Sequence, residues 1–491
     1  MFSFLAPPPP APQLPEEKIP TAYQRYRWQV FSGIFIGYAA YYLLRKNFTL
    51  AGPFLVESGF SKTELGFAMS GVAIAYGLSK FVMGSVSDRS NARNFLSVGL
   101  LLTAVLTILA GVFARPEGMG SWTETMIRFP GLTLWENETR YIGLPEFSVR
   151  AILLVWFGIQ LLIGWFGGCG WPPCGRVMTH WFSLKERGRT VALWNVAHNV
   201  GGGLLAPITM MGVAIFGASR WEYGVFYLPA IIALGIAAIA WLLIRDTPQS
   251  CGLPPVEVYK NDFPPEYSEK DEQELSTREI FFRYVFGNRI LWYVAIANAF
   301  IYMLRYGVLD WAPTYLNEIK GYDLHDIGGA YFLYEFAAIP GTLLCGWMSD
   351  LLFRGRHALT AIFFTALTVV FILVYWWNPP GHKWIDFMAL LAIGFLIYGP
   401  VMLTGVLALE IAPKKASGTA AGFTGFWGYM FGTAILANWM MGVIVDKSGW
   451  NGGFTALCIG GGFAVFFMLL AAVAEEKVRR KKKLETQEAG K

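Results

Sequence analysis

Residues 37–47, GYAAYYLLRKN, place Arg45 inside an otherwise apolar run that extends over residues 28–56. A run of this length can cross a bilayer as a helix, for which about 20 residues suffice. Arg45 then lies only about a turn from the membrane centre, where an arginine costs roughly 2.5–3.5 kcal/mol on insertion scales. A charge at that depth predicts a binding site for an anion or a carboxylate.

The same arrangement returns in IYMLRYGVLDW, where Tyr302 and Arg305 correspond to Tyr42 and Arg45 at a spacing of 260 residues. Later motifs repeat at similar spacings, among them GSVSD at residues 84–88 and GWMSD at residues 346–350. Such a repeat predicts two parallel halves with a site between them near mid-membrane, as in transporters that open alternately to each side. The two arginines would then face each other.

The composition supports a polytopic membrane protein. The chain has 491 residues, of which 55% are hydrophobic and 15% charged, and its mean hydropathy is +0.43. Soluble domains carry about 25% charged residues. We therefore predict an all-α membrane protein with twelve transmembrane helices in two pseudo-symmetric six-helix halves. The predicted spans are residues 29–51, 65–86, 94–114, 151–178, 189–216, 223–244, 290–314, 327–349, 358–377, 386–409, 418–444 and 453–474.

The predicted domain organisation follows from these spans and from the loop charges. It comprises an N-terminal tail (1–28), a first half (29–244), a polar linker (245–289), a second half (290–474) and a basic tail (475–491). Lysine and arginine gather in the loops on one side, so the linker and both termini are expected to be cytoplasmic. The enlarged loop at residues 115–150 is expected to be external.

Several function classes find no support in the sequence. Four of the five cysteines lie in apolar runs, and no Cys/His cluster indicates a metal. No P-loop or Ser/His/Asp set is present, so neither an enzyme nor a cofactor is expected. The net charge of +5 comes mostly from loop and tail lysines and does not imply nucleic acid. The expected partners are small-molecule substrates and the lipid bilayer, and the expected state is a monomer.

Arg45 and Arg305 together favour phosphate capture. A guanidinium stays charged and offers paired donors that match phosphate oxygens. The alternative is that each arginine is neutralised by an acidic neighbour or extends to the headgroups. An arginine occurs at the corresponding position in each half, and this repetition argues against that alternative.

Other charges within the spans are expected to serve the same site. Lys46 points about 100° away from Arg45 around the helix, and we expect it to pair with Asp310, Glu335 or both across the halves. A purely structural ion pair is the alternative. Lys80 is expected to face the cavity, although a lysine that extends to the headgroups explains it equally well.

His198 shares one helix face with Trp194 and Asn195. Its imidazole titrates near the second pKa of phosphate, so it could donate to the ion or follow its protonation; a satisfied core histidine is the alternative. Hydroxyls for the site are expected from tyrosines, which taken singly are usually packing residues: Tyr38, Tyr42, Tyr302, Tyr398 and Tyr429.

Gly84, Asp88, Arg89 and Arg93 form GxxxDRxxxR in a predicted cytoplasmic turn and resemble the signature of the major facilitator superfamily. The glycine would allow close helix approach, and the charges would pair when the cytoplasmic side closes. The motif is therefore expected to act as a conformational latch and not to bind substrate.

Longer stretches carry a closer resemblance: GYAAYYLLRKNF, GSVSDRSNAR, GWPPCGRVMTHWFSLKERG, WNVAHNVGGG, RDTPQSCGLPP, LRYGVLDWAPTYL, YFLYEFAAIPGTLLCGWMSD, FLIYGPVML and APKKASGTAAGFTG. They resemble the organophosphate:phosphate antiporter family of that superfamily over nearly the whole chain. The resemblance implies uptake of sn-glycerol 3-phosphate across the bacterial inner membrane in exchange for inorganic phosphate.

By the same resemblance, site residues of the family match Arg45, Arg305, His198, Lys80, Tyr38, Tyr42, Tyr302 and Tyr429, and its inter-domain charge network matches Lys46, Asp310 and Glu335. The enlarged 115–150 loop departs from the family pattern. The expected function is rocker-switch antiport without ATP. A hexose-phosphate or phosphoglycerate antiporter, or a receptor for sugar phosphates with little transport, remains the alternative.

Overall fold

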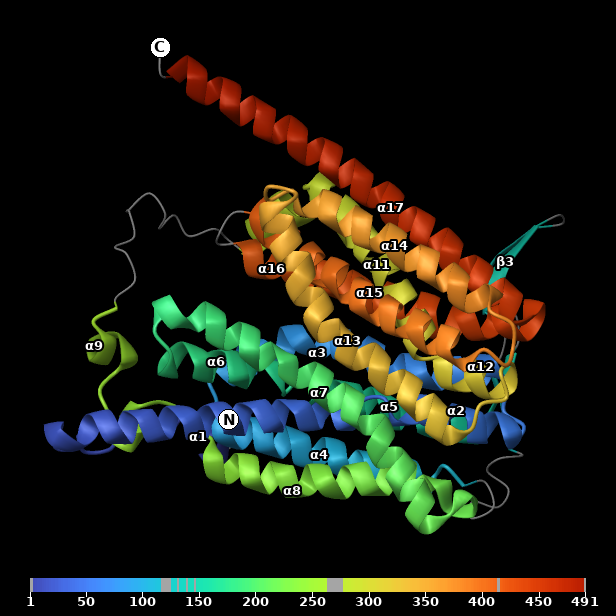
Figure 1. Cartoon of the computed structure of the whole chain (residues 1–491), viewed down its shortest axis with the longest axis horizontal. Helices are drawn as coiled ribbons and strands as arrows, with labels where there is room; N and C mark the ends of the chain where they lie inside the picture. Colours follow the sequence, from blue (N-terminus) through green and yellow to red (C-terminus); the bar gives the residue numbers. More distant parts are fainter. Residues whose placement is uncertain are drawn as a thin grey trace.

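The structure is a computed structural model that describes residues 3–115, 125–129, 132–137, 140–144, 147–262, 277–412 and 416–489. Long helices lie side by side along the long axis of the molecule (Figure 1). The predicted helical membrane fold is therefore confirmed, with one local exception in the 115–150 loop.

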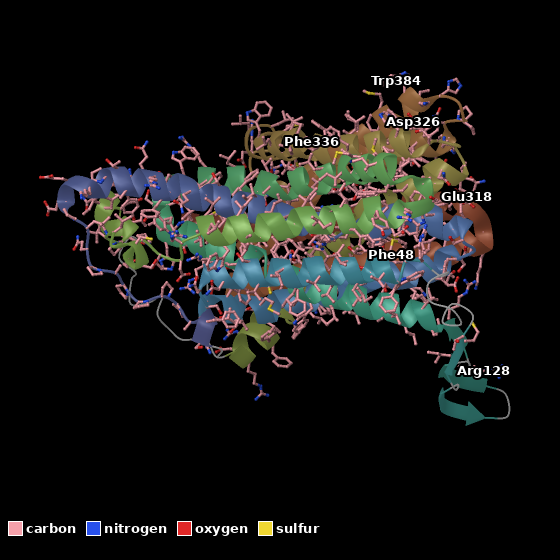
Figure 2. All side chains as sticks on the ribbon, turned by 90° about the horizontal axis from the view of Figure 1, so that it is seen from below. Phe48, Arg128, Glu318, Asp326, Phe336 and Trp384 are labelled. Atoms are coloured by element: carbon pink, nitrogen blue, oxygen red, sulfur yellow. The ribbon has the colours of Figure 1, made fainter. Side chains whose placement is uncertain are left out.

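That loop carries strands, which the sequence did not predict. β1 (Met126–Phe129) pairs antiparallel with β4 (Phe147–Arg150), and β2 (Leu132–Asn137) pairs antiparallel with β3 (Arg140–Leu144). Short segments rich in aromatic and β-branched residues favour strands. Figure 2 shows this ribbon, labelled at Arg128, projecting beyond the end of the helices where Glu318 also lies.

The N-terminal helices form one group, and the C-terminal helices form a second (Figure 1). The first group is α1 (Ile19–Leu43), α2 (Asn47–Glu57), α3 (Lys62–Asp88), α4 (Ala92–Val112), α5 (Ala151–Gly167), α6 (Trp171–Trp181), α7 (Leu184–Phe216), the π-helical η6 (Tyr223–Tyr227) and α8 (Leu228–Leu243). The second is α11 (Arg289–Leu309), α12 (Ala312–Glu318), α13 (Leu324–Leu351), α14 (His357–Trp377), α15 (Lys383–Ile411), α16 (Ser417–Phe426), the π-helical η11 (Trp427–Met440) and α17 (Met441–Ala489). Along the chain, three short helices come after the first group and before the second: α9 (Val256–Lys260), α10 (Thr277–Glu279) and η9 (Ile280–Val285).

The strict count of spans differs from the predicted twelve. Within the described residues, nine helical segments are long and apolar enough to cross a membrane, or ten with the bent α3. Residues 417–474 count once although they include 58 residues, about 87 Å of helix at 1.5 Å per residue. This stretch kinks at Gly449, whose φ is 67°. Starting from ten, division of this stretch into two spans gives eleven. Addition of α1, whose first turns are polar, gives twelve.

The first and seventh spans are broken, although continuous helices were predicted there. α1 ends before Arg45 and α2 begins at Asn47, whose side-chain amide donates to the Val225 carbonyl (2.7 Å). In the second group, α11 ends before Asp310 and α12 begins with Pro313 in its first turn, where the ring lacks a donor that an intact helix would need. Broken helices in corresponding spans of the two halves are typical of transporter binding sites.

Three sets of contacts join the two groups: α3 with α16, η11 and α17, α7 with α13, and α2 with α12. At α7 the approach depends on small residues, because a Cβ on Gly203 would lie 2.5 Å from the Phe336 ring. Toward the end that carries α9 and α16, the two groups diverge (Figure 1). The groups therefore meet near the middle and at the end that carries the strands.

Candidate functional site

Arg45 lies in the break between α1 and α2 and is surrounded by tyrosine rings. Its guanidinium carbon lies 3.9 Å from the ring centroid of Tyr76, 5.1 Å from that of Tyr429 and 5.5 Å from that of Tyr42. One terminal nitrogen donates to the Tyr42 hydroxyl (3.4 Å). The Nε of Arg45 is buried and has no hydrogen-bond partner. Tyr429 comes from the second group of helices, so the environment of Arg45 is already shared between both groups.

Arg305 occupies the corresponding place in α11 and is only 6% exposed. Its guanidinium carbon lies 3.9 Å from the ring centroid of Tyr398 and 4.7 Å from that of Tyr306. Its Nε is also buried without a partner. The burial excludes an arginine that extends to the headgroups in this conformation.

The nearby carboxylates are engaged elsewhere. Both oxygens of Asp310 lie 2.6 Å from Lys46 Nζ, so the expected pairing across the halves is made with Asp310. Glu335 accepts from the Tyr398 hydroxyl (2.6 Å) and more distantly from the Asn199 amide (3.5 Å), not from Lys46. Among the described residues, neither Arg45 nor Arg305 forms an ion pair. Neutralisation by an acidic neighbour is therefore absent there.

The Lys46–Asp310 pair connects the two helix breaks. Lys46 lies in the break of the first span, and Asp310 begins the break of the seventh. The side chain of Asp310 is fully buried and that of Lys46 is 14% exposed. The Tyr306 ring, 4.2 Å from Lys46 Nζ, adds a contact with the cation. Movement of either break relative to the other must therefore disturb a buried ion pair.

His198 lies between residues of both groups. Its ring centroid is 5.4 Å from that of Tyr42 and 6.2 Å from that of Tyr398, which packs on Arg305. Its Nδ1 contacts the carbonyl of Asn195. Since that carbonyl is an acceptor, the bond requires a proton on Nδ1 and leaves Nε2 as the free ring nitrogen in the neutral form. The imidazole thus bridges the aromatic surroundings of the two arginines.

Two further predicted residues contact the tyrosines that surround Arg45. Tyr38 stacks on Trp194 at 4.5 Å, and its hydroxyl lies 3.4 Å from that of Tyr42. Tyr302 contacts the Tyr429 ring at 5.1 Å.

Lys80 is exposed, and its Nζ lies 4.7 Å from the Tyr429 ring centroid and 4.9 Å from that of Tyr76. It is therefore directed toward this tyrosine cluster.

Sequence reasoning missed Tyr76, Tyr306 and Asn199 as site residues. Tyr76 lies one turn before Lys80 and Tyr306 directly follows Arg305, so spacing relative to the charged residues was an available signal. Asn199 directly follows His198 and reaches Glu335 across the interface. No local signal distinguishes it from the polar residues around it.

The charged residues of the GxxxDRxxxR motif do not join the two groups of helices in this structure. Arg93 donates to the Trp241 carbonyl (2.5 Å) and packs on its ring (3.8 Å). In the described part of the chain, Asp88 and Arg89 form no ion pair, and nothing lies within 4 Å of a Cβ placed on Gly84. The expected close helix approach at this glycine is therefore absent in this conformation.

Arg176 instead organises this turn. It donates to the carbonyls of Ser87 (3.1 Å), Asp88 (3.0 Å) and Ser90, and pairs with Asp246 (3.0 Å). Asp246 also accepts from the backbone N–H of Ala92 (2.9 Å). These contacts stay within the first group of helices, so they order the turn without joining the groups.

The end that carries the strands is closed by contacts between the groups. Asp446 of α17 accepts from the backbone N–H groups of Lys62 (3.1 Å) and Thr63 (2.6 Å) and from the Thr63 hydroxyl (2.6 Å). It therefore caps the N-terminus of α3 from the other group. Lys62 Nζ also pairs with Glu318 (2.7 Å), which accepts from the Trp450 indole (2.9 Å).

Two groups of membrane-spanning helices that meet around intramembrane cations define a helical membrane transporter. Residues 34–437 match the Major Facilitator Superfamily, and the chain belongs to that family. It is 51% identical over 457 residues to the glycerol-3-phosphate transporter of Bacillus subtilis, with 93% of this chain and 95% of the relative covered. The glycerol-3-phosphate transporter of Haemophilus influenzae is 44% identical over 491 residues, with 95% of each covered.

A solved structure shows the same fold at much lower sequence identity. The nucleoside transporter NupG superposes with a TM-score of 0.61 at 14% identity, with 91% of this chain and 99% of that chain covered. The likeness supports the arrangement of the helices and carries no information on the substrate.

Proposed function

We propose that this chain is a secondary active transporter that takes up sn-glycerol 3-phosphate in exchange for inorganic phosphate. The two relatives named as glycerol-3-phosphate transporters support the organic substrate. Organic phosphate and inorganic phosphate share the group that the two arginines would hold. If the two ligands occupy this one site in turn, each crossing of one is followed by the return of the other, which gives one-for-one exchange.

The observation that carries this proposal is that the Nε atoms of Arg45 and Arg305 are both buried without a hydrogen-bond partner. Buried polar groups are nearly always hydrogen-bonded, so two unpartnered Nε atoms on unpaired guanidinium groups need an explanation. A phosphate held between them would supply acceptor oxygens in the paired geometry that guanidinium prefers. Two buried arginines cost roughly 5–7 kcal/mol on insertion scales, which a bound dianion would offset.

The surrounding side chains receive the other roles. Lys80 of α3 supplies a further donor for the phosphate, and His198 of α7 donates from Nε2 when its imidazole carries a second proton. The hydroxyls of Tyr38, Tyr42, Tyr302 and Tyr429 are the contacts for the glycerol portion, which inorganic phosphate lacks.

The closing contacts support alternating access. Asp446 and Glu318 join the two groups at one end, whereas Arg176 and Asp246 pair within one group at the other. We assign the closed end to the outside and the diverging end to the cytoplasm, which gives an inward-facing conformation with both termini cytoplasmic.

In the opposite conformation, Asp88 and Arg89 would join the groups at the cytoplasmic end. Binding of phosphate between the arginines would draw the groups together there and disturb the Lys46–Asp310 pair. The protein is proposed to act as a monomer in a bacterial inner membrane.

Exchange in proteoliposomes tests the function. Vesicles loaded with inorganic phosphate would be offered labelled glycerol 3-phosphate, glucose 6-phosphate or phosphoglycerate in turn. Rapid uptake of glycerol 3-phosphate that depends on internal phosphate is the expected result. Preferred uptake of another ester would overturn the substrate, binding without uptake would indicate a receptor, and uptake without internal phosphate would refute exchange.

A further inference from the structure

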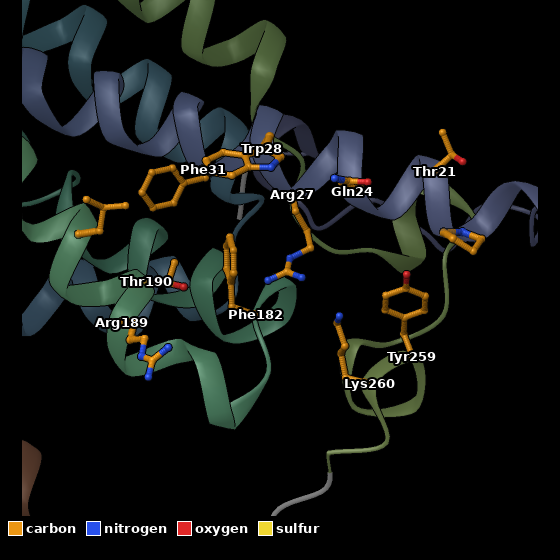
Figure 3. Close-up of a pocket in the computed structure, with 12 residues that line it drawn as sticks. Thr21, Gln24, Arg27, Trp28, Phe31, Phe182, Arg189, Thr190, Tyr259 and Lys260 are labelled. Atoms are coloured by element: carbon orange, nitrogen blue, oxygen red, sulfur yellow. The ribbon is translucent and has the colours of Figure 1, made fainter.

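A second cationic cavity lies beside the N-terminal part of α1, apart from Arg45 and Arg305. Its volume is about 600 Å³, and cations from three elements line it: Arg27 of α1, Arg189 of α7 and Lys260 at the end of α9. Figure 3 shows these side chains around the opening between α1 and the other two elements. The described residues that line the cavity include no carboxylate.

The charge of this cavity is only partly compensated. Arg27 pairs with Glu186 (2.5 Å), which is not among the residues that line the cavity, and its guanidinium packs on the Phe182 ring at 4.7 Å. Its Nε is nevertheless buried and has no hydrogen-bond partner. In the described part of the chain, Arg189 and Lys260 form no ion pair. Three cations against one carboxylate leave a net charge of about +2, which favours an anion.

One rim of the same cavity is apolar and exposed. Trp28 is 65% exposed and Leu193 56% exposed, and both line the cavity together with Phe31. Trp28 lies where the apolar run of α1 begins, a position at which tryptophan is enriched at membrane interfaces. The cavity therefore combines a cationic wall with an exposed apolar rim.

We propose that this cavity binds an anionic phospholipid of the adjacent leaflet. The phosphate group would accept from Arg27, Arg189 and Lys260, and the acyl chains would lie along Trp28 and Leu193. Basic pockets between membrane helices suit anionic headgroups, and the volume falls within the range of small-molecule sites. A free phosphate ion could use the cations, but it has no apolar part to cover the rim. The site is independent of the transport site, and the proposal does not rest on the proposed exchange.

Native mass spectrometry of the delipidated full chain tests this proposal. Phosphatidylglycerol and phosphatidylcholine with identical acyl chains would be titrated separately, and inorganic phosphate would form a third arm, because the adduct mass separates the sources. The expected result is one phosphatidylglycerol retained in preference to phosphatidylcholine. The double variant Arg189→Gln/Lys260→Gln should weaken that binding by roughly thirtyfold, from about fivefold for each cation near a membrane surface.

The matched control is Arg283→Gln/Arg356→Gln, which removes the same charge from exposed residues of η9 and of the turn before α14. It should leave the lipid preference unchanged. Equal retention of both lipids, an equal loss in both double variants, or inorganic phosphate bound in place of lipid at this cavity would each overturn the proposal. Circular dichroism of both variants verifies that the helices are retained.

Discussion

Replacement of Asp446 by alanine should open the closed end of the transporter. The carboxylate receives two backbone N–H groups and one hydroxyl from the first turn of α3, and all three bonds cross between the groups of helices. Loss of an N-cap acceptor costs about 0.5–2 kcal/mol, and an exposed hydroxyl bond adds about 0.5–1 kcal/mol. A total of about 1–3 kcal/mol should increase the equilibrium constant for opening by roughly 5- to 150-fold.

Distances between spin labels measure this shift. Labels at Glu57 and Lys447, which are both exposed at the closed end, would be introduced after replacement of Cys251 and Cys458 by serine. Double electron–electron resonance should then show a longer distance that gains population in Asp446→Ala. The ratio of the two populations gives the change in the equilibrium constant directly.

The matched control is Asp323→Ala. Asp323 also caps a helix, but it accepts from Asp326 within its own helix α13. Its loss should reduce local helix stability without a change in the distance distribution. An unchanged distribution in Asp446→Ala, or an equal change in Asp323→Ala, would refute the assignment of Asp446 as a contact that closes this end.

Two further substitutions probe the interior. Lys46→Met leaves the fully buried Asp310 without its partner and should destabilise the protein by about 3–5 kcal/mol. The double variant Lys46→Met/Asp310→Leu should regain part of the lost melting temperature. No such recovery would contradict this explanation. Gly201→Ala would place a Cβ 2.0 Å from the Ala39 carbonyl and should cost about 1–3 kcal/mol. Gly188→Ala, with nothing within 4 Å, should be neutral or slightly stabilising in the same thermal assay, and equal effects would count against close packing at Gly201.

The sequence predicts the general fold because hydrophobic length and charge depth are local properties. The repeat around Arg45 and Arg305 and the spacing of the apolar runs are enough to predict paired halves. Because few carboxylates occur at that depth, the sequence also predicts that Lys46 pairs with Asp310, Glu335 or both, and the structure shows the pair with Asp310. The inferences about Arg45, Arg305 and Lys46 all depend on charged residues, whose burial in a membrane is costly.

Features that depend on tertiary contacts were not predictable in this way. The break at Arg45 is stabilised by Asn47 and Lys46, whose partners Val225 and Asp310 are remote in sequence. The strands at 126–150 arise from pairing that hydropathy does not reveal. Arg176 and Asp246 appeared only as parts of longer similar stretches, because nothing local indicates that one orders the turn at residues 87–90.

Arg45 and Arg305 are proposed to bind phosphate together. Equilibrium binding of labelled inorganic phosphate to the purified protein tests it most directly, with Arg283→Gln as the charge-matched control. Two hydrogen bonds to charged groups at about 1.5 kcal/mol each predict that Arg45→Gln or Arg305→Gln weakens binding by roughly 150-fold. Wild-type affinity in either single variant that remains folded would show that the two arginines do not bind phosphate together.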